Sequence, residues 1–266
     1  EETPEGGEVQ NKGGRPRKLE TVEEFTEVAE KYILYIYERI YMTYLQTLYG
    51  IFIEGARYKY ILQGLGFSVG VTALSAIIGL ILGIFFALLR LSKIKVLEYV
   101  SIGYVDLIRG TPAVVQLMIL ANIVFVGQYL SKTPVLIVAA LAFGINSGAY
   151  VTEIIRAGIE SLDKGQMEAA RSLGMNYRLS MTEIILPQAI KRILPTLVSE
   201  FITLLKETSI VGFIGGVDLL RSANIITSQT YRGVEPLLAV GLVYLILIGI
   251  FTKIMRIVER SLKVSD

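Results

Sequence analysis

The residues best suited to chemistry are three charged side chains that stand inside one apolar run of the sequence. Glu200, Lys206 and Glu207 fall within residues 193–214, a run otherwise mostly apolar. Charges in a membrane helix are costly against lipid, so they face other helices or a water-filled cavity. Glu200 and Glu207 are seven residues apart and share a helix face. This pattern predicts either a site for a charged small molecule or an internal salt bridge with Lys206 that packs helices.

The chain lacks the residue types that most enzymes need for catalysis. It contains no His and no Cys, which excludes a Ser-His-Asp triad, an imidazole zinc site, a thiolate metal site and a disulfide framework. It also has no G-x-x-x-x-G-K-[ST] loop, so it does not bind ATP through such a loop. The net charge of +2 is too small to indicate nucleic-acid binding. We therefore expect no catalytic site and no metal in this chain.

Apolar runs dominate the sequence and predict an all-α integral membrane protein. Hydrophobic residues make up 53% of the chain, and they are concentrated in long runs. A helix of about 20 apolar residues crosses a bilayer core of about 30 Å. Five runs meet this length: Gly66–Leu91, Thr111–Leu130, Pro134–Ile155, Ile193–Ile214 and Pro236–Ile257.

Lys and Arg indicate the orientation of these five predicted spans. Basic residues are frequent after the first span, in the long polar segment 156–192 and at the C-terminus, and sparse in the other two connections. With five spans, the three basic segments fall on one side, which the positive-inside rule identifies as the cytoplasm. The sequence thus predicts a multi-pass protein with a cytoplasmic C-terminus.

The N-terminal part differs in composition from the rest. Residues 1–31 are rich in charge and Gly, show no cleavable signal peptide, and are expected to form a disordered tail. Residues 32–58 form an amphipathic segment that contains many Tyr and a narrow polar stripe. This pattern fits either a helix that lies flat in the membrane interface or a sixth span.

The polar segment 156–192 is too long and too patterned for a simple connection. It reads as short helices broken by Gly165, Gly174 and Pro187. The small pair Ala169 and Ala170 would let another surface approach closely, and Gly174 permits a sharp turn. Either the segment docks a soluble partner or it is an ordinary amphipathic connector.

Several motifs in this region and near it resemble those of a known family. Residues 168–187 match the pattern E-A-A-x3-G-x9-I-x-L-P, formed by Glu168, Ala169, Ala170, Gly174, Ile184, Leu186 and Pro187. Arg109, Gly110, Thr111 and Pro112 form an RGTP element. Residues 150–158 fit Y-x-x-E-x-x-R-x-G, which includes Glu153 and Arg156, and residues 205–209 read LKETS. Residues 60–260 resemble the permease subunits of polar amino-acid ABC importers, and residues 1–55 lie outside the resemblance.

The resemblance implies a type I ABC importer permease domain over residues 60–260, with a coupling loop at 156–192. Its implied partners are a separate ATPase subunit that holds ATP and Mg, a second permease subunit in a homodimer or heterodimer, and an extracytoplasmic amino-acid-binding protein. No cofactor is implied in this chain. The implied location is the inner membrane of a bacterial or archaeal cell. Coupling to the ATPase would involve Gly165, Glu168, Ala169, Ala170, Gly174, Leu186 and Pro187.

The other charged and polar positions divide into two sets. The predicted substrate pathway contains Asn146, Glu153, Glu200, Lys206, Glu207, Thr208 and Ser209. Arg109 and Arg156 are expected at cytoplasmic membrane ends, as part of a charge network or as interfacial anchors. The alternative function is a stand-alone secondary carrier, although such carriers usually show inverted repeats, and none is visible here. An amino acid of polar or charged type is the expected substrate.

Overall fold

The computed structural model describes residues 22–92, 94–126 and 132–263, and these residues form helices joined by short connections. The chain divides into two compact units, residues 1–55 and 56–266.

The first unit contains the long helix α1 (Val22–Phe52). Residues 22–31 are helical, so the prediction of a disordered tail over 1–31 is wrong for them; residues 1–21 lie outside the described part. The sequence VEEFTEVAEK contains several good helix formers, which explains the early start. The short helix η1 (Glu54–Ala56) follows, and both Gly55 (φ +69°) and Ala56 (φ +53°) have left-handed backbone angles. These angles interrupt the helical path between the units.

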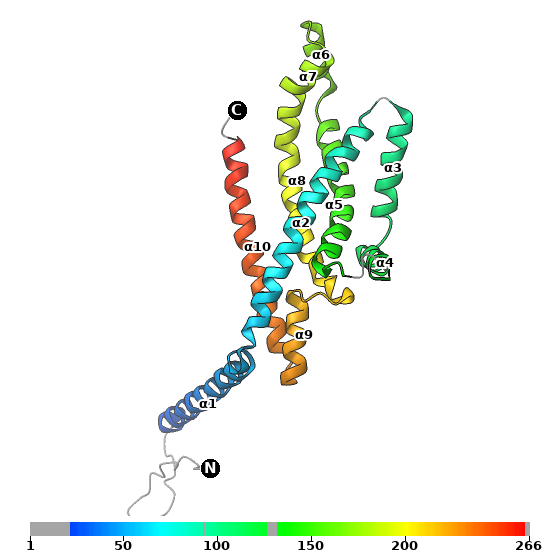
Figure 1. Ribbon diagram of the computed structural model, residues 1–266. Coiled ribbons are helices and arrows are strands. Elements are labelled where there is room, and N and C mark those ends of the chain that lie inside the picture. The colour runs from blue at the N-terminus through cyan, green and yellow to red at the C-terminus, as the bar shows by residue number, and fades with distance from the viewer. Residues whose placement is uncertain (1–21, 93, 127–131, 264–266) are drawn as a thin grey trace, which may run out of the picture. The chain divides into compact units, whose positions relative to one another are not determined.

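The second unit holds the long apolar helices. It contains α2 (Tyr58–Arg90), α3 (Lys95–Arg109), α4 (Ala113–Val126), α5 (Val135–Glu160), α6 (Lys164–Ser172), α7 (Tyr177–Ser180), the π-helical turn η2 (Met181–Ile185), α8 (Leu186–Glu207), η3 (Thr208–Ile214), α9 (Leu219–Thr230) and α10 (Val234–Lys263). In this unit α6, α7, the end of α2 and the C-terminal end of α10 lie at one end, and α9 lies at the opposite end (Figure 1).

Three of the five predicted spans agree with helices that are long and apolar enough to cross a membrane. Among the described residues these are Glu54–Arg90, Val135–Glu160 and Val234–Ile257. The predicted span at 193–214 corresponds to α8, which begins earlier at Leu186, and to η3. Its charged residues make it less apolar than the three others.

The predicted span at 111–130 begins with α4 (Ala113–Val126), and residues 127–131 lie outside the described part. Among the described residues, α4 is long and apolar enough for a span only when it is taken together with the preceding helix α3. Residues 95–109, expected to be a connection, form the helix α3 instead, and α3 and α4 are bent by 101° against each other. Hydropathy did not reveal α3, because this helix carries charges at both ends and is amphipathic.

Small residues allow α2 and α5 to pack closely along their length. The buried face of α2 repeats a small residue about every fourth position, through Ser68, Ser75, Gly79, Gly83 and Ala87. Such a face lets helix backbones approach each other in a membrane. Across the contact, the Ser75 hydroxyl donates to the Ala140 carbonyl at 3.2 Å.

Two apolar clusters fix the other helices to this pair. Val71, Phe143, Leu204 and Val211 are buried in a cluster that joins α2, α5, α8 and η3. A second cluster, centred on Val151, Ile185, Ala189, Ile193 and Leu197, packs α8 and η2 against the end of α5 that leads to α6. The helices that carry polar side chains are therefore held on a common apolar frame.

Candidate functional site: a cleft among three helices and a helix–turn–helix at one end

The segment between α5 and α8 forms a capped helix–turn–helix. Asp163 caps α6, since its side chain accepts a hydrogen bond from the Gly165 backbone N–H at 2.8 Å. Asn176 caps α7 in the same way, through the Leu179 N–H at 2.9 Å. Between the two helices, Gly174 has a φ of +85°, a left-handed angle that residues with a Cβ adopt at a cost. A tight, locally specified turn results.

Not all of the predicted coupling residues are exposed on the surface of the chain. Glu168 and Ala169 are exposed, as a docking surface requires, whereas Ala170 is 1% exposed and packs inside the chain. The proposed small pair therefore presents only Ala169 outward. Leu173, beside the turn, is 83% exposed.

Of the three residues predicted to break the helices, Gly165, Gly174 and Pro187, two lie inside helices. Gly165 lies in the first turn of α6, and Pro187 occupies an early position of α8, where proline is tolerated. Leu186 is the first residue of α8, so it belongs to this helix together with Pro187. Of these three residues only Gly174 lies in a break of the helical path, and a second break, at Ser161–Asp163, precedes Gly165.

The RGTP element forms the bend between α3 and α4. Gly110 ends α3, and a Cβ there would lie 2.6 Å from the Asp106 carbonyl oxygen, so a side chain does not fit. The Gln116 amide Nε2 donates to the Ile108 carbonyl at 2.7 Å and to the Thr111 hydroxyl at 2.7 Å. Gln116 therefore connects α4 back to the end of α3 and holds the bend.

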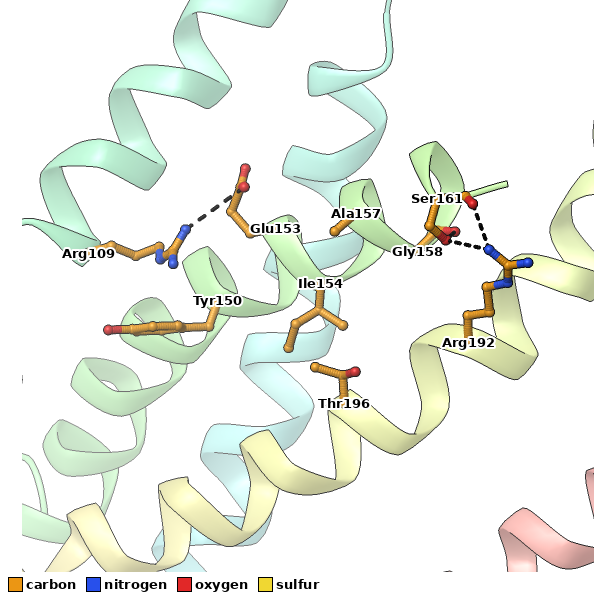
Figure 2. A pocket seen from close by; sticks show the side chains of 9 residues that line it. All are labelled: Arg109, Tyr150, Glu153, Ile154, Ala157, Gly158, Ser161, Arg192 and Thr196. Atoms are coloured by element: carbon orange, nitrogen blue, oxygen red, sulfur yellow. Dashed lines mark hydrogen bonds and ion pairs between the residues drawn. The ribbon is translucent and has the colours of Figure 1, made fainter. Parts of the chain in front are cut away.

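Arg109 lies beside α5, at the end of a helix. This corrects the expectation of a connection between the first two predicted spans, because that segment contains α3 and Arg109 is its last residue. The guanidinium lies over the Tyr150 ring, 5.1 Å from its centroid, and 3.9 Å from a Glu153 carboxylate oxygen (Figure 2). Arg156 binds Glu153 more closely, at 2.7 Å, and also pairs with Glu160. The predicted charge network of Arg109, Glu153 and Arg156 is present.

Arg109, Tyr150 and Glu153 line a cleft of about 440 Å³ among α3, α5 and α8. Arg109, Tyr150 and Glu153 lie at one side, and Thr196 and Arg192 of α8 lie at the other (Figure 2). The Arg192 guanidinium donates to the Ser161 carbonyl at 2.6 Å, so it ties α8 to the end of α5. The cleft thus presents cations, a carboxylate and an aromatic ring to one space.

Asn146 and Glu200 each bond to a side chain of a neighbouring helix. The Asn146 amide, 4% exposed, donates to the Gln116 side-chain oxygen at 3.0 Å. The Glu200 carboxylate accepts a hydrogen bond from the Ser147 hydroxyl at 2.9 Å. Because both bonds involve α5, this helix connects the polar groups of α4 and α8.

The remaining predicted pathway residues lie at the end of α8. Glu207 ends the helix and is partly buried, as is Ser209, while the Lys206 side chain is exposed. Thr208 is fully buried, and its hydroxyl donates to the Leu205 carbonyl at 2.7 Å. This bond satisfies its hydroxyl hydrogen inside the turn, which assigns Thr208 to structure and leaves Glu200 and Glu207 as the carboxylates of α8.

Sequence reasoning missed four residues that organise the cleft: Tyr104, Gln116, Ser147 and Tyr150. Tyr104 donates to the Ile145 carbonyl at 2.6 Å and fixes α3 against α5. Tyr150 stood in a recognised motif without a role, and Gln116 follows the RGTP element closely enough to suggest a local contact. Ser147 and Tyr104 carry no sequence signal of their own, because their partners lie on distant helices.

The site lies in the part of the chain that matches a known family. Residues 79–264 match the family described as binding-protein-dependent transport system inner membrane component. The arginine transport system permease protein ArtQ of Bacillus subtilis is 45% identical over 210 residues, which cover 78% of this chain and 94% of ArtQ. A putative glutamine transport system permease protein GlnP of Rickettsia bellii is 40% identical over 208 residues, 77% of this chain and 94% of that protein.

A solved structure agrees with these relatives. The crystal structure described as an amino acid ABC transporter with histidines has a TM-score of 0.73 and 43% sequence identity. The match covers 79% of this chain and 98% of the solved one.

Proposed function

Because the chain belongs to the family of binding-protein-dependent transport system inner membrane components, as the permease subunit of an amino-acid ABC importer, we propose how its parts perform transport. The helix–turn–helix of α6 and α7 receives a separate ATPase subunit, and the cleft among α3, α5 and α8 lies on the path of the amino acid. The observation that carries the proposal is that one chain joins an exposed, capped docking element to a polar cleft between apolar helices.

The family also decides between the functions that the sequence left open. The resemblance drawn from the E-A-A-x3-G pattern and the RGTP element is confirmed, and so is the multi-pass, all-α permease fold. The alternative of a stand-alone secondary carrier is wrong, since the relatives and the solved structure are ABC transport proteins.

Coupling depends on the rigidity of the turn and on the exposed side chains of α6. Glu168 and Ala169 project from α6 at the end of the unit that also holds the basic C-terminal part of α10. The positive-inside rule places that end in the cytoplasm, where an ATPase meets it. The buried cluster of Ile185, Ala189 and Ile193 joins η2 and α8 to α5, so a force on α6 reaches the cleft through packed side chains.

The cleft suits a molecule that carries both charges of an amino acid. The Arg109 side chain is 42% exposed, and its ion pair with Glu153 is long, at 3.9 Å. A substrate carboxylate can therefore approach the Arg109 guanidinium. Glu153 lines the cleft and offers an acceptor for an ammonium or guanidinium group. Glu200 and Glu207 lie farther along α8, outside the lining of the cleft, and offer further acceptors on the proposed path. The relatives named for arginine and glutamine favour a polar or charged amino acid as the substrate.

The remaining partners follow from the proposed assembly. A second permease subunit, identical or related, completes the pathway, and an extracytoplasmic binding protein delivers the amino acid. ATP and Mg belong to the ATPase subunit, since this chain has no phosphate-binding loop of its own. The C-terminus lies in the cytoplasm, and the protein spans the membrane of a bacterial or archaeal cell.

Site-specific photo-crosslinking tests the docking proposal. The chain is free of Cys, so a single Cys at Ala169 can carry a benzophenone label, with Tyr231, 93% exposed before α10, as the control position. We expect illumination of membranes that contain the cognate ATPase to crosslink it at position 169 and not at 231. Active transport with crosslinking at neither position, or at 231 alone, would overturn the docking assignment.

A further inference from the structure

The helix α1 exposes large apolar side chains over most of its circumference. The side chains of Ile33, Tyr37, Ile40 and Tyr41 are between 54% and 69% exposed. α1 lies in its own compact unit and outside the residues that match the family. A surface of this kind needs an apolar or interfacial environment to cover it.

The distribution of tyrosines along α1 separates a flat helix from a spanning one. Tyr is repeated along the helix at Tyr32, Tyr35, Tyr37, Tyr41, Tyr44 and Tyr49. Tyr favours the membrane–water interface, which is a thin layer. At about 1.5 Å per residue these positions extend over about 25 Å, so an upright helix would place Tyr41 and Tyr44 near the bilayer centre. A flat helix keeps all six at interfacial depth.

Polar side chains form a stripe along the C-terminal half of α1, over residues 39–50. It consists of Arg39, Thr43, Gln46, Thr47 and Gly50. Hydrogen bonds follow the stripe: Arg39 donates to the Tyr35 hydroxyl at 3.1 Å, Thr43 to the Arg39 carbonyl at 2.8 Å, and Thr47 to the Thr43 carbonyl at 2.9 Å. A stripe parallel to the axis divides this part of the helix into a wet side and an apolar side, as interfacial helices require. In addition, α1 is not among the described helices apolar enough to cross a membrane.

We propose that α1 lies flat in the membrane–water interface, with its polar stripe toward water and the opposite side, around Tyr37 and Leu48, among the lipid headgroups and upper acyl chains. Only Ile53–Arg57 separate α1 from the start of α2, and these residues reach at most about 20 Å. α1 therefore occupies the interface in which α2 begins. This side is extracytoplasmic if α6 and α7 are cytoplasmic, and that part of the inference rests on the proposed function.

Spin labels on single Cys variants of the full-length protein in bilayers measure the depth of each position. Tyr37 and Leu48 are eleven residues apart, share a face, and differ by about 16 Å along the axis. Thr43 and Gln46 report on the polar stripe. We expect labels at 37 and 48 at equal depth, about 5–10 Å below the headgroups, and labels at 43 and 46 accessible to water-soluble relaxation agents. A depth difference of about 16 Å between 37 and 48 would show a spanning helix and overturn the proposal.

The same variants separate the other outcomes. Labels at 37 and 48 that are inaccessible to both oxygen and aqueous agents would place α1 against protein, which also contradicts a lipid partner. An impermeant thiol reagent then identifies the side: we expect Gln46→Cys to react from outside and Asp163→Cys, in the α6 cap, only from inside. Reaction of both from one side, with the depth result intact, would refute the proposed sidedness and leave the flat position of α1 standing.

Discussion

Glu200 and Glu207, the two carboxylates that the charge pattern singled out, have different surroundings in the structure. Glu200 accepts a hydrogen bond from Ser147, whose side chain is fully buried, so its position is fixed by α5. Glu207 ends α8 and is partly exposed. The types and the shared helix face of these residues followed from the sequence, whereas the Ser147 contact, between residues 53 positions apart, did not.

Changing Glu207 to Gln tests whether this carboxylate meets a cationic substrate. We expect Glu207→Gln to weaken transport of a cationic amino acid by about ten- to a hundred-fold, because a hydrogen bond to a charged group contributes roughly 1.5–3 kcal/mol. A neutral amino acid should be affected less. Uptake into proteoliposomes with the partner subunits measures both, with Glu98→Gln, whose carboxylate pairs with Lys95 on α3, as the control. Equal losses for all substrates would assign Glu207 to packing.

Gln116 is expected to hold the bend between α3 and α4. In Gln116→Leu the Ile108 carbonyl and the Asn146 amide lose a partner bonded at 2.7 and 3.0 Å, respectively. Leaving the buried Asn146 amide unpaired costs about 1–3 kcal/mol, so the Tm of the purified protein should fall by several degrees. Asn122→Leu is the matched control, since exposed Asn122 donates to Met118 in its own helix. Equal Tm values for the two variants would remove Gln116 from this role.

The bent pair α3–α4 is the element that sequence reasoning could not find. Hydropathy detects length and apolarity, so the existence of α2, α5 and α10 was predicted, although α2 begins eight residues earlier than expected and α5 and α10 end five and six residues later. The predicted span 111–130 begins in α4 and leaves out α3, which ends in the charged residue Arg109. The bend itself depends on contacts of Gln116 with residues before it, which a periodicity analysis does not register.

The contact between α2 and α5 depends on Gly83. A Cβ at Gly83 would lie 2.3 Å from the Val151 Cγ1 atom, a distance that forces the helices apart. We expect Gly83→Ala to lower the Tm, and the second change Val151→Ala to restore part of the loss by making room. Gly103→Ala, where a Cβ meets no atom within 4 Å, is the control. A double variant as unstable as Gly83→Ala alone would refute direct contact as the cause.

The turn at Gly174 is expected to transmit the ATPase cycle. A Cβ there meets no atom within 4 Å, so the cost of a side chain arises from the left-handed φ of +85° and not from a clash. Gly174→Val should therefore separate ATP hydrolysis from uptake or release the ATPase, whereas Gly174→Asn should keep most coupling, since Asn tolerates this conformation. Co-purification and the ratio of transport to hydrolysis measure both. Wild-type coupling in Gly174→Val would contradict the prediction.

The chain as a whole combines a family domain with an addition. Residues 79–264 carry the family match, and the motifs that predicted it, such as Glu168 to Pro187, are local in sequence and therefore readable. The cleft is not local: Arg109, Tyr150 and Arg192 come from three helices. Hence the class of the protein could be predicted from the sequence, but the set of residues that meet in the cleft could not.

Uptake by reconstituted vesicles tests the central claim most directly. Proteoliposomes would contain the permease with its cognate ATPase, the binding protein outside and ATP inside, and radiolabelled arginine and glutamine would be offered in parallel. We predict uptake of at least one of them that requires ATP, the ATPase subunit and the binding protein together. Uptake by the permease alone, driven by an ion gradient and indifferent to ATP, would contradict the account.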